Sequence, residues 1–163
     1  MYNIFIGNPY DVGVLGENDV LVATTNGVTR NNGYAVMGKG SAEPFKTIFG
    51  VDKLLGEYLR KYGNRAFFLG DYPYTDSKDT TTHIKLATFP TKHHWRDKSD
   101  LELIEASAIQ IKAMADKFNF QKVYIPIPGC SNGQLSWKQV KEKLKILDDR
   151  FIIYSFNASD FNM

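Results

Sequence analysis

Short apolar runs that alternate with longer amphipathic segments limit this chain to one broad class of fold. The run over 19–25 is almost continuously apolar, as expected for a strand in a sheet that is covered on both faces. The polar segment 71–81 predicts a hairpin-like or extended surface connection. We therefore expect an α/β fold, a three-layer α/β/α sandwich with a central mixed, mostly parallel sheet and right-handed crossovers. The predicted strands cover residues 2–6, 19–25, 65–70, 82–89, 122–127 and 150–156.

The segments between these runs carry the signals of helices. Apolar residues recur at helical spacing over 41–62, which predicts one long helix. Ser99 and Glu102 fit the capping-box pattern and predict the start of a second helix. Ser136 and Gln139 repeat that pattern, so we expect a third helix to begin there.

The length and composition of the chain are those of one domain. Its 163 residues are enough to enclose a core, so we expect a single domain over 1–163. The one cysteine, Cys130, excludes an internal disulfide. No segment has a signal-peptide layout or the roughly 20 apolar residues of a membrane span. We expect a monomer without a membrane partner, located in the cytoplasm, or in the host cytoplasm if the chain is viral.

The net charge of the chain is too small to indicate a nucleic-acid binder by bulk electrostatics. It is +2, and charged residues make up 23% of the sequence. Any contact with a polyanion must therefore be local. A short basic run beside Trp95 has the charge and the stacking surface to follow a single strand, although a solvated rim is the simpler interpretation. This run contains Lys92, His93, Arg96 and Lys98.

Two glycine-bearing loops precede two of the predicted helices. In the first loop, Gly38 and Gly40 flank Lys39 just before the helix over 41–62, and the second loop covers 128–133. Glycines let the backbone approach a ligand, and the N–H groups of a first helical turn favour phosphate. Two such loops beyond the carboxyl ends of strands suit a diphosphate better than a single phosphate. The alternative is that these glycines only shape turns.

Three other kinds of site find little support in the sequence. Residues 33–39 read G-x-x-x-x-G-K, but Gly40 stands where a P-loop needs a hydroxyl to ligate magnesium. His93 and His94 point to opposite faces of an extended backbone and lack ligand partners at helical spacing, so we expect no metal and no cofactor. Cys130 lies in a predicted phosphate loop, where a packing role is expected rather than a nucleophilic one.

Three sequence blocks together resemble those of the macro domain family, whose members are α/β/α modules that bind ADP-ribose. They are Asn26 followed by VMGKGSAEPFK at 36–46, FPTKHHWRDKSDLELIE at 89–105, and IPGCSNGQLSW at 127–137. The middle block is similar to one branch of the family. That branch includes a bacterial antitoxin that removes ADP-ribose from thymidine in DNA and, more distantly, the human terminal ADP-ribose glycohydrolase. The resemblance spans nearly the whole chain.

The resemblance implies that the two loops hold the diphosphate and the distal ribose of ADP-ribose from opposite sides with backbone N–H groups. Asn26 matches an asparagine that contacts the distal ribose. Most members place an adenine-binding aspartate after the first strand, where this chain has Asn8, with Asp11 as the second candidate a few residues on. Tyr154 and Phe156 stand where relatives stack an aromatic ring on the adenosine, although ordinary strand packing explains them equally well. The implied loop residues are Met37, Gly38, Lys39, Gly40, Ser41, Gly129, Cys130, Ser131, Asn132 and Gly133, with Thr91 beside them.

Lys92 follows Thr91 and matches the lysine that acts at the anomeric carbon of ADP-ribose in this branch. A neutral amine would capture the opened ribose as a Schiff base, whereas an ammonium would stabilise the departing group while water attacks. A solvated lysine without a catalytic role is the third interpretation. Gly133 stands where the human relative has an aspartate that resolves the lysine adduct, which argues against a carboxylate-assisted route here.

The function implied first is a mono-ADP-ribosyl hydrolase that acts on a modified DNA base or, less readily, on a modified protein. The alternatives are a module that binds or sequesters ADP-ribose or a related NAD-derived metabolite without turnover, and a phosphatase for ADP-ribose 1″-phosphate. The segment 27–36 is longer than its counterpart in relatives. We expect this extension to cover the distal ribose, with Arg30, Asn31 and Asn32 tuning the group attached beyond it. A bacterial or phage origin would suit these features.

Overall fold

The fold is known from a computed structural model that describes residues 1–130 and 133–162. Ser131 and Asn132, two of the residues assigned to the second glycine loop, lie outside the described residues. The strands are β1 (Asn3–Ile6), β2 (Val20–Thr25), β3 (Phe68–Thr75), β4 (Thr81–Pro90), β5 (Val123–Pro126) and β6 (Phe151–Ser155). The helices are α1 (Ala42–Thr47), α2 (Asp52–Tyr62), α3 (Leu101–Phe118) and α4 (Trp137–Val140), with the 3-10 turns η1 (Lys141–Leu144) and η2 (Ala158–Asn162).

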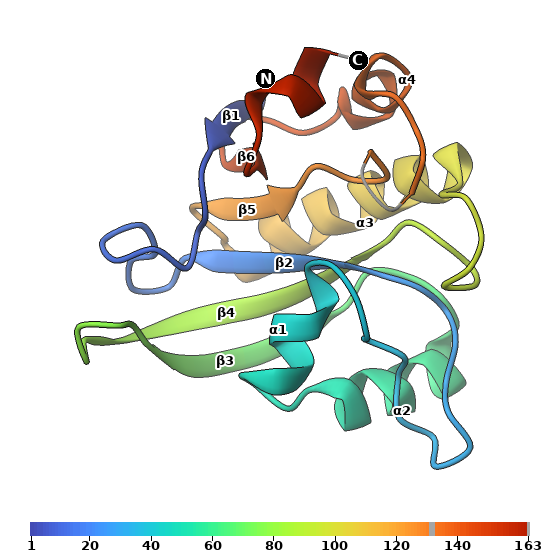
Figure 1. The fold of residues 1–163 in the computed structure, drawn as a ribbon, viewed down its shortest axis with the longest axis horizontal. Coiled ribbons are helices and arrows are strands. Elements are labelled where there is room, and N and C mark those ends of the chain that lie inside the picture. Colours follow the sequence, from blue (N-terminus) through green and yellow to red (C-terminus); the bar gives the residue numbers. More distant parts are fainter. Residues whose placement is uncertain (131–132, 163) are drawn as a thin grey trace.

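A single mixed sheet forms the centre of the molecule, in the order β1-β6-β5-β2-β4-β3 (Figure 1). The first five strands in this order run parallel, and only β3 runs antiparallel to its neighbour β4. The predicted α/β sandwich with a mostly parallel sheet is therefore confirmed. The carboxyl ends of the five parallel strands share one edge of the sheet, where ligands bind in folds of this kind.

Helices cover both faces of the sheet, and the side chains of β2 show how the core is divided. Val20 and Val22 pack into the cluster under α3 and α4, whereas Leu21 and Ala23 pack into the cluster under α1 and α2. All four are at most 1% exposed. Burial on both sides explains the continuous apolar run, since each buried aliphatic side chain contributes about 1.5–3 kcal/mol.

The long helix predicted over 41–62 is in fact two helices. The first, α1, ends at Thr47, and α2 begins at Asp52. Between them Gly50 has a φ of 65°, which places it in the left-handed region and breaks the helical path. The apolar spacing continues across the break because Val51, like the helical residues on either side, is buried in the same cluster.

The start of α3 also differs from the prediction. Asp100 is the N-cap, and its carboxylate accepts hydrogen bonds from the backbone N–H groups of Glu102 and Leu103 at 2.9 and 3.4 Å. Ser99 instead donates its backbone N–H to the carbonyl of Gly133 at 2.9 Å, so it belongs to the wall of the second glycine loop. The capping box of Ser99 was therefore wrong.

The capping box at Ser136 is confirmed. The Ser136 hydroxyl accepts from the Gln139 backbone N–H, and the Gln139 side chain accepts from the Ser136 backbone N–H at the start of α4. The polar segment 71–81 proves to be mostly strand, because β3 continues to Thr75 and β4 begins at Thr81. The turn between them is closed by Asp76, whose side chain accepts from backbone N–H groups of the turn.

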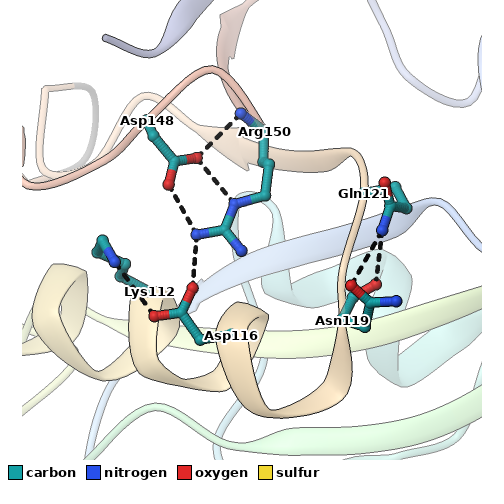
Figure 2. Close-up of polar contacts among 6 residues, drawn as sticks. All are labelled: Lys112, Asp116, Asn119, Gln121, Asp148 and Arg150. Atoms are coloured by element: carbon teal, nitrogen blue, oxygen red, sulfur yellow. Dashed lines mark hydrogen bonds and ion pairs between the residues drawn. The ribbon is translucent and has the colours of Figure 1, made fainter.

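A network of ion pairs ties α3 to the amino end of β6, far from the ligand-binding edge of a parallel sheet (Figure 2). Arg150 donates to Asp148 from Nε and Nη2 at 2.9 and 2.7 Å, and Nη2 also reaches Asp116 at 2.8 Å. Lys112 completes the network with a 3.1 Å contact to Asp116. The Arg150 guanidinium holds the pKa of Asp148 at about 2.

Within 1–130 and 133–162 no helix is long and apolar enough to cross a membrane.

Candidate functional site

A cleft of about 840 Å³ lies at the carboxyl ends of the five parallel strands. This volume is within the range of small-molecule sites in proteins. The cleft brings together segments that are far apart in the sequence, because each strand contributes the residues that follow its end. Of the residues expected to bind ligand, those that line the cleft are Asn8, Asn26, Met37, Gly38, Lys39, Gly40, Ser41, Thr91, Lys92, Gly129, Gly133 and Tyr154.

The two ends of this cleft differ in chemistry. Tyr154 and Phe156 line it at the end of β6, and Lys92 and Arg96 line it beyond the end of β4. The strands β5 and β2 lie between β6 and β4 in the sheet. Three strand spacings separate these ends by about 14 Å. A ligand that contacts both ends must therefore be much longer than a diphosphate.

The first glycine loop is fixed to the sheet through Ser41. Its hydroxyl accepts a hydrogen bond from the backbone N–H of Thr24 at 2.9 Å and lies 3.0 Å from the Thr24 hydroxyl. Gly40 has a φ of 63°, a conformation that favours glycine. The turn before α1 is thus set by its own backbone geometry and by an anchor on β2.

Gly38 has a different environment from Gly40. A Cβ atom placed on Gly38 would meet no atom within 4 Å. The backbone N–H groups of Gly38, Lys39 and Gly40 donate to no acceptor within the described part of the chain. Three N–H groups without protein partners, beside a glycine that no packing requires, are the arrangement expected of an anion cradle.

The second glycine loop is tightly packed. Gly129 has a φ of 75°, and a Cβ atom on Gly133 would lie 2.2 Å from the Ser99 hydroxyl and 2.6 Å from the Gly129 Cα. Any side chain at 133 would therefore force this wall apart. The sequence suggested a mechanistic meaning for the glycine at 133, and the structure adds a packing reason. The Ser99 hydroxyl itself is buried and has no hydrogen-bond partner among the described residues.

Lys92 lies half-buried in the wall of the cleft, and its backbone is held in place from several sides. Thr91 donates its N–H to the Thr25 carbonyl at 3.0 Å, and the Lys92 carbonyl accepts from the Asn64 side chain at 2.9 Å. The Lys92 Nζ donates to the carbonyl of Trp95 at 3.3 Å. The side-chain nitrogen is therefore directed along the segment 92–95 at the cation-bearing end of the cleft.

The two neighbouring histidines contact different residues outside the cleft. His93 Nε2 lies 3.2 Å from the Asp100 carboxylate, and the His94 ring packs on Trp95 with centroids 5.1 Å apart. Neither histidine lines the cleft. No group of three or more metal-binding side chains occurs within the described ranges.

Trp95 and Arg96 form an exposed rim next to Lys92. The Trp95 side chain is 52% exposed, the Arg96 guanidinium lies 6.0 Å from its ring centroid, and both residues line the cleft. An exposed indole beside an arginine is a typical stacking surface for a base.

Asn26 holds the start of the extension. Its Nδ2 donates to the Val36 carbonyl at 3.1 Å, and its Oδ1 accepts from the Val28 N–H at 3.0 Å. Each of these atoms has capacity for one further hydrogen bond, so a ribose contact remains compatible with the structural role. No sequence signal indicated these two local hydrogen bonds.

Most of the extension packs on α2, and only Val36 at its end lines the cleft. Ala35 donates to the Asp52 carbonyl at 2.8 Å, Arg60 donates to the Gly33 carbonyl, and a Cβ atom on Gly56 would lie 2.0 Å from that same carbonyl. The three tuning residues expected at the distal ribose do not line the cleft. Arg30, Asn31 and Asn32 are exposed on the loop beside α2.

At the other end of the cleft, Asn8 and the two aromatic residues divide their roles. The Asn8 Oδ1 accepts from the Tyr10 N–H at 2.9 Å, so this oxygen closes the turn after β1. Tyr154 is buried, which raises the pKa of its hydroxyl, and forms part of the core as well as the cleft wall. Phe156 is 65% exposed. It is therefore the ring available for stacking.

Cys130 does not line the cleft. It is buried in the core, and burial raises the pKa of its thiol to about 12. The Sγ atom donates to the Pro128 carbonyl at 3.5 Å. These observations confirm the packing role that the sequence predicted for Cys130.

Sequence reasoning missed three residues at the end of β6 and beyond it. Ser155, Asn157 and Asp160 line the cleft next to Phe156. The only signal in the sequence is that polar residues directly follow a predicted strand, which is the position of functional residues in parallel sheets.

Comparison with known proteins agrees with this geometry. Residues 28–144 match the family model described as Macro domain. A DNA ADP-ribosyl glycohydrolase of Mycobacterium tuberculosis is 30% identical over 130 residues, which are 79% of this chain and 36% of that protein. The chain spans about a third of the length of the curated relatives it matches.

Solved structures give the same result. The macrodomain of Mycobacterium tuberculosis DarG is similar with a TM-score of 0.67 and 30% identity, covering 94% of this chain and 97% of that chain. Thermosipho africanus DarTG in complex with ADP-ribose is similar with a TM-score of 0.59 and 25% identity, covering 84% of this chain and 38% of that chain. The fold, the paired glycine loops and these similarities together show that the chain belongs to the macro domain family.

Proposed function

We propose that this chain binds ADP-ribose in the cleft and hydrolyses the mono-ADP-ribosyl linkage to a target, with a DNA base favoured over a protein side chain. The observation that carries this proposal is the row of N–H groups at Gly38, Lys39 and Gly40, which have no partner among the described residues and line a cleft with an aromatic end and a cationic end. The relatives named DNA ADP-ribosyl glycohydrolase support the reaction, and the ADP-ribose complex supports the ligand.

The proposed ligand matches the cleft in order and in length. The diphosphate lies against the N–H groups of the first glycine loop and against the second loop at Gly129 and Gly133. The adenosine extends toward Phe156, and the distal ribose extends toward Asn26 and Lys92. A spacing of about 14 Å between β6 and β4 suits an extended sugar nucleotide.

Lys92 is the proposed catalytic residue, acting at the anomeric carbon of the distal ribose. In one route its neutral amine attacks this carbon and displaces the base, which takes up the proton that the amine loses. The glycosylamine that forms opens its ribose ring to an imine, and water later hydrolyses this imine to release the sugar and the lysine. In the other route its ammonium stabilises the departing group while water attacks. Both routes require the side-chain nitrogen to lie at the cationic end of the cleft.

The rim formed by Trp95 and Arg96 supports a nucleic-acid target. A base next to the modified nucleotide would stack on the exposed indole, and Arg96 would lie near its phosphate. Stacking of this kind contributes about 1–3 kcal/mol per base. The small net charge of the whole chain fits a local contact of this kind.

We propose that the domain acts as a monomeric unit over 1–163, in the cytoplasm.

The test offers wild-type protein three substrates: an ADP-ribosylated single-stranded oligonucleotide, an ADP-ribosylated protein and ADP-ribose 1″-phosphate. Calorimetry measures the affinity for ADP-ribose in parallel. We expect release of ADP-ribose from the oligonucleotide at the highest rate. Tight binding without turnover of any substrate would establish a reader or sequestering module instead. Release of phosphate alone would establish the phosphatase.

A further inference from the structure

Asp160 is an unexpected residue in a cleft that is otherwise built for an anion. It is the one carboxylate among the described lining residues, which include the cations Lys39, Lys92 and Arg96. A carboxylate repels a diphosphate, and a gap of a few ångströms does not remove that repulsion. Its position favours a ligand group that it attracts, namely a neutral hydrogen-bond donor.

Asp160 reaches the cleft because the last turn of the chain folds back on β6. This turn, η2, is anchored by Phe161, whose ring packs edge-on against Trp137 with centroids 5.1 Å apart. Asp160 also donates its backbone N–H to the Asn157 carbonyl at 3.2 Å. The turn is thus held from both sides, and the carboxylate is placed over the end of β6.

A chain of hydrogen bonds orients the carboxylate. The Ser155 hydroxyl accepts from the Asn157 backbone N–H at 3.3 Å and donates to Asp160 Oδ2. Ser155 is only 6% exposed. An ionised carboxylate has about four acceptor positions. The bond to Ser155 uses one of these, so Asp160 keeps capacity to accept from a ligand.

The position of Asp160 is at the aromatic end of the cleft. Ser155 is the last residue of β6, and the exposed ring of Phe156 follows it directly. The side-chain oxygen of Asn8, which also lines this end, is uncharged and accepts one bond from the Tyr10 N–H. A base stacked on Phe156 therefore finds its charged acceptor in Asp160 and not in the turn after β1.

We propose that Asp160 accepts a hydrogen bond from the exocyclic amino group of the adenine and selects a 6-amino purine over a 6-keto purine. The carboxylate attracts the amino hydrogens, whereas it repels a keto oxygen in the same place. Ser155 acts as a positioning residue for this contact. The inference rests on the proposed function, because it assumes that the nucleotide lies in this cleft.

The experiment compares two ligands, ADP-ribose and inosine diphosphate ribose, by calorimetry on the wild-type protein, Asp160→Asn and Asp149→Asn. Asp149 is an exposed aspartate beyond the opposite end of β6, so its substitution is a matched control for the change in charge. We expect wild type and Asp149→Asn to bind ADP-ribose at least tenfold more tightly than the inosine ligand. We expect Asp160→Asn to lose at least tenfold in affinity for ADP-ribose and most of this selectivity, because an amide also donates to a keto oxygen.

The outcomes separate this inference from the proposed function. Equal affinity of wild type for the two ligands overturns the role of Asp160 and leaves ADP-ribose binding intact. An equal loss for both ligands in Asp160→Asn also overturns it, because the carboxylate then acts on the ribose or on the fold. Failure of wild type to bind either ligand overturns the proposed function itself. If Asp160→Asn fails to fold, Ser155→Ala replaces it, because it removes the hydroxyl that orients the carboxylate, and unchanged selectivity in that variant overturns the role of Asp160.

Discussion

The two ends of the sheet use charged and polar groups in opposite ways. At the amino end of β6, Arg150 is paired with two aspartates, and Figure 2 shows the side chains of Asp148, Asp116 and Lys112 joined to it in one network. At the carboxyl end, backbone N–H groups around Gly38 and the acceptor positions of Asp160 remain available. Polar groups at the first end stabilise the fold, and those at the second end are left for a ligand. Substitutions at the two ends should therefore affect different measurements.

The substitution with the largest expected effect is at Lys92, and it should change turnover without changing stability. Lys92→Ala should lower turnover of the ADP-ribosylated oligonucleotide by at least about 10²-fold, because a group at the reacting carbon is lost. Its melting temperature and affinity for ADP-ribose should stay near those of wild type. Lys53→Ala, at an exposed lysine on α2, is the control and should keep full turnover. Comparable turnover by Lys92→Ala and Lys53→Ala would show that Lys92 takes no part in the reaction.

Arg150→Ala should give the reverse result. Loss of the guanidinium leaves Asp148 without its charged donor and Asp116 with Lys112 alone, and we expect the free energy of unfolding to fall by about 2 kcal/mol. The free energy of unfolding of Arg150→Lys should lie between those of Arg150→Ala and wild type, since lysine keeps the charge but not the forked geometry. Urea denaturation measures this free energy for both variants. Affinity for ADP-ribose should not change, and a parallel loss of affinity would show that the two ends are coupled.

The two glycines of the first loop repeat the comparison on a smaller scale. Gly40→Ala should lower stability by about 1–2 kcal/mol, because a left-handed φ strains alanine. Gly38→Ala should leave stability unchanged but weaken ADP-ribose binding about tenfold, or about 1.4 kcal/mol, since its methyl group enters the cleft. Thermal melting and calorimetry on both variants provide the check. Equal affinities of Gly38→Ala and wild type would mean that the phosphates do not contact this loop.

The smallest expected effect is a dependence of stability on pH at the paired end. The pKa of Asp148 is about 2 in the folded protein and near 3.9 in an unfolded chain. A lowered pKa stabilises the fold fully above about pH 5, and this contribution disappears as the pH falls from about 4 to 2. We expect it to be worth about 1 kcal/mol, because solvent screens the pair. Urea denaturation of wild type and Asp148→Asn between pH 2 and 7 tests this, and curves of identical shape would contradict it.

Local sequence signals predicted the parts of the fold that local physics decides. The continuous apolar run of β2 and the capping box at Ser136 each depend on a few neighbouring residues, and both were read correctly. The break at Gly50 was missed because the apolar spacing continues through it. Asp100 replaced Ser99 as the cap of α3 because Ser99 is held by Gly133, which is more than thirty residues away in the chain.

The candidate site was predicted where the backbone itself forms it. The glycine loops and Lys92 lie in short segments with their own signature, and the structure places them around one cleft. Asp160 could not be predicted, because its position depends on the packing of Phe161 against Trp137. The position of the extension was missed for a similar reason. It depends on a close approach between Gly33 and Gly56 that no single segment reveals.

The close packing of Gly133 against Ser99 and Gly129 in the second glycine loop limits how this site can be re-engineered. A Cβ atom at 133 would overlap the Ser99 hydroxyl, so an acidic residue cannot be installed there by one substitution. The hydroxyl at residue 99 would have to be removed in the same step, and the backbone at Gly129 would still have to move. We therefore expect substitutions at 99 and 133 to occur together or not at all. A single substitution that places an acidic residue at 133 would disrupt the packing of this wall.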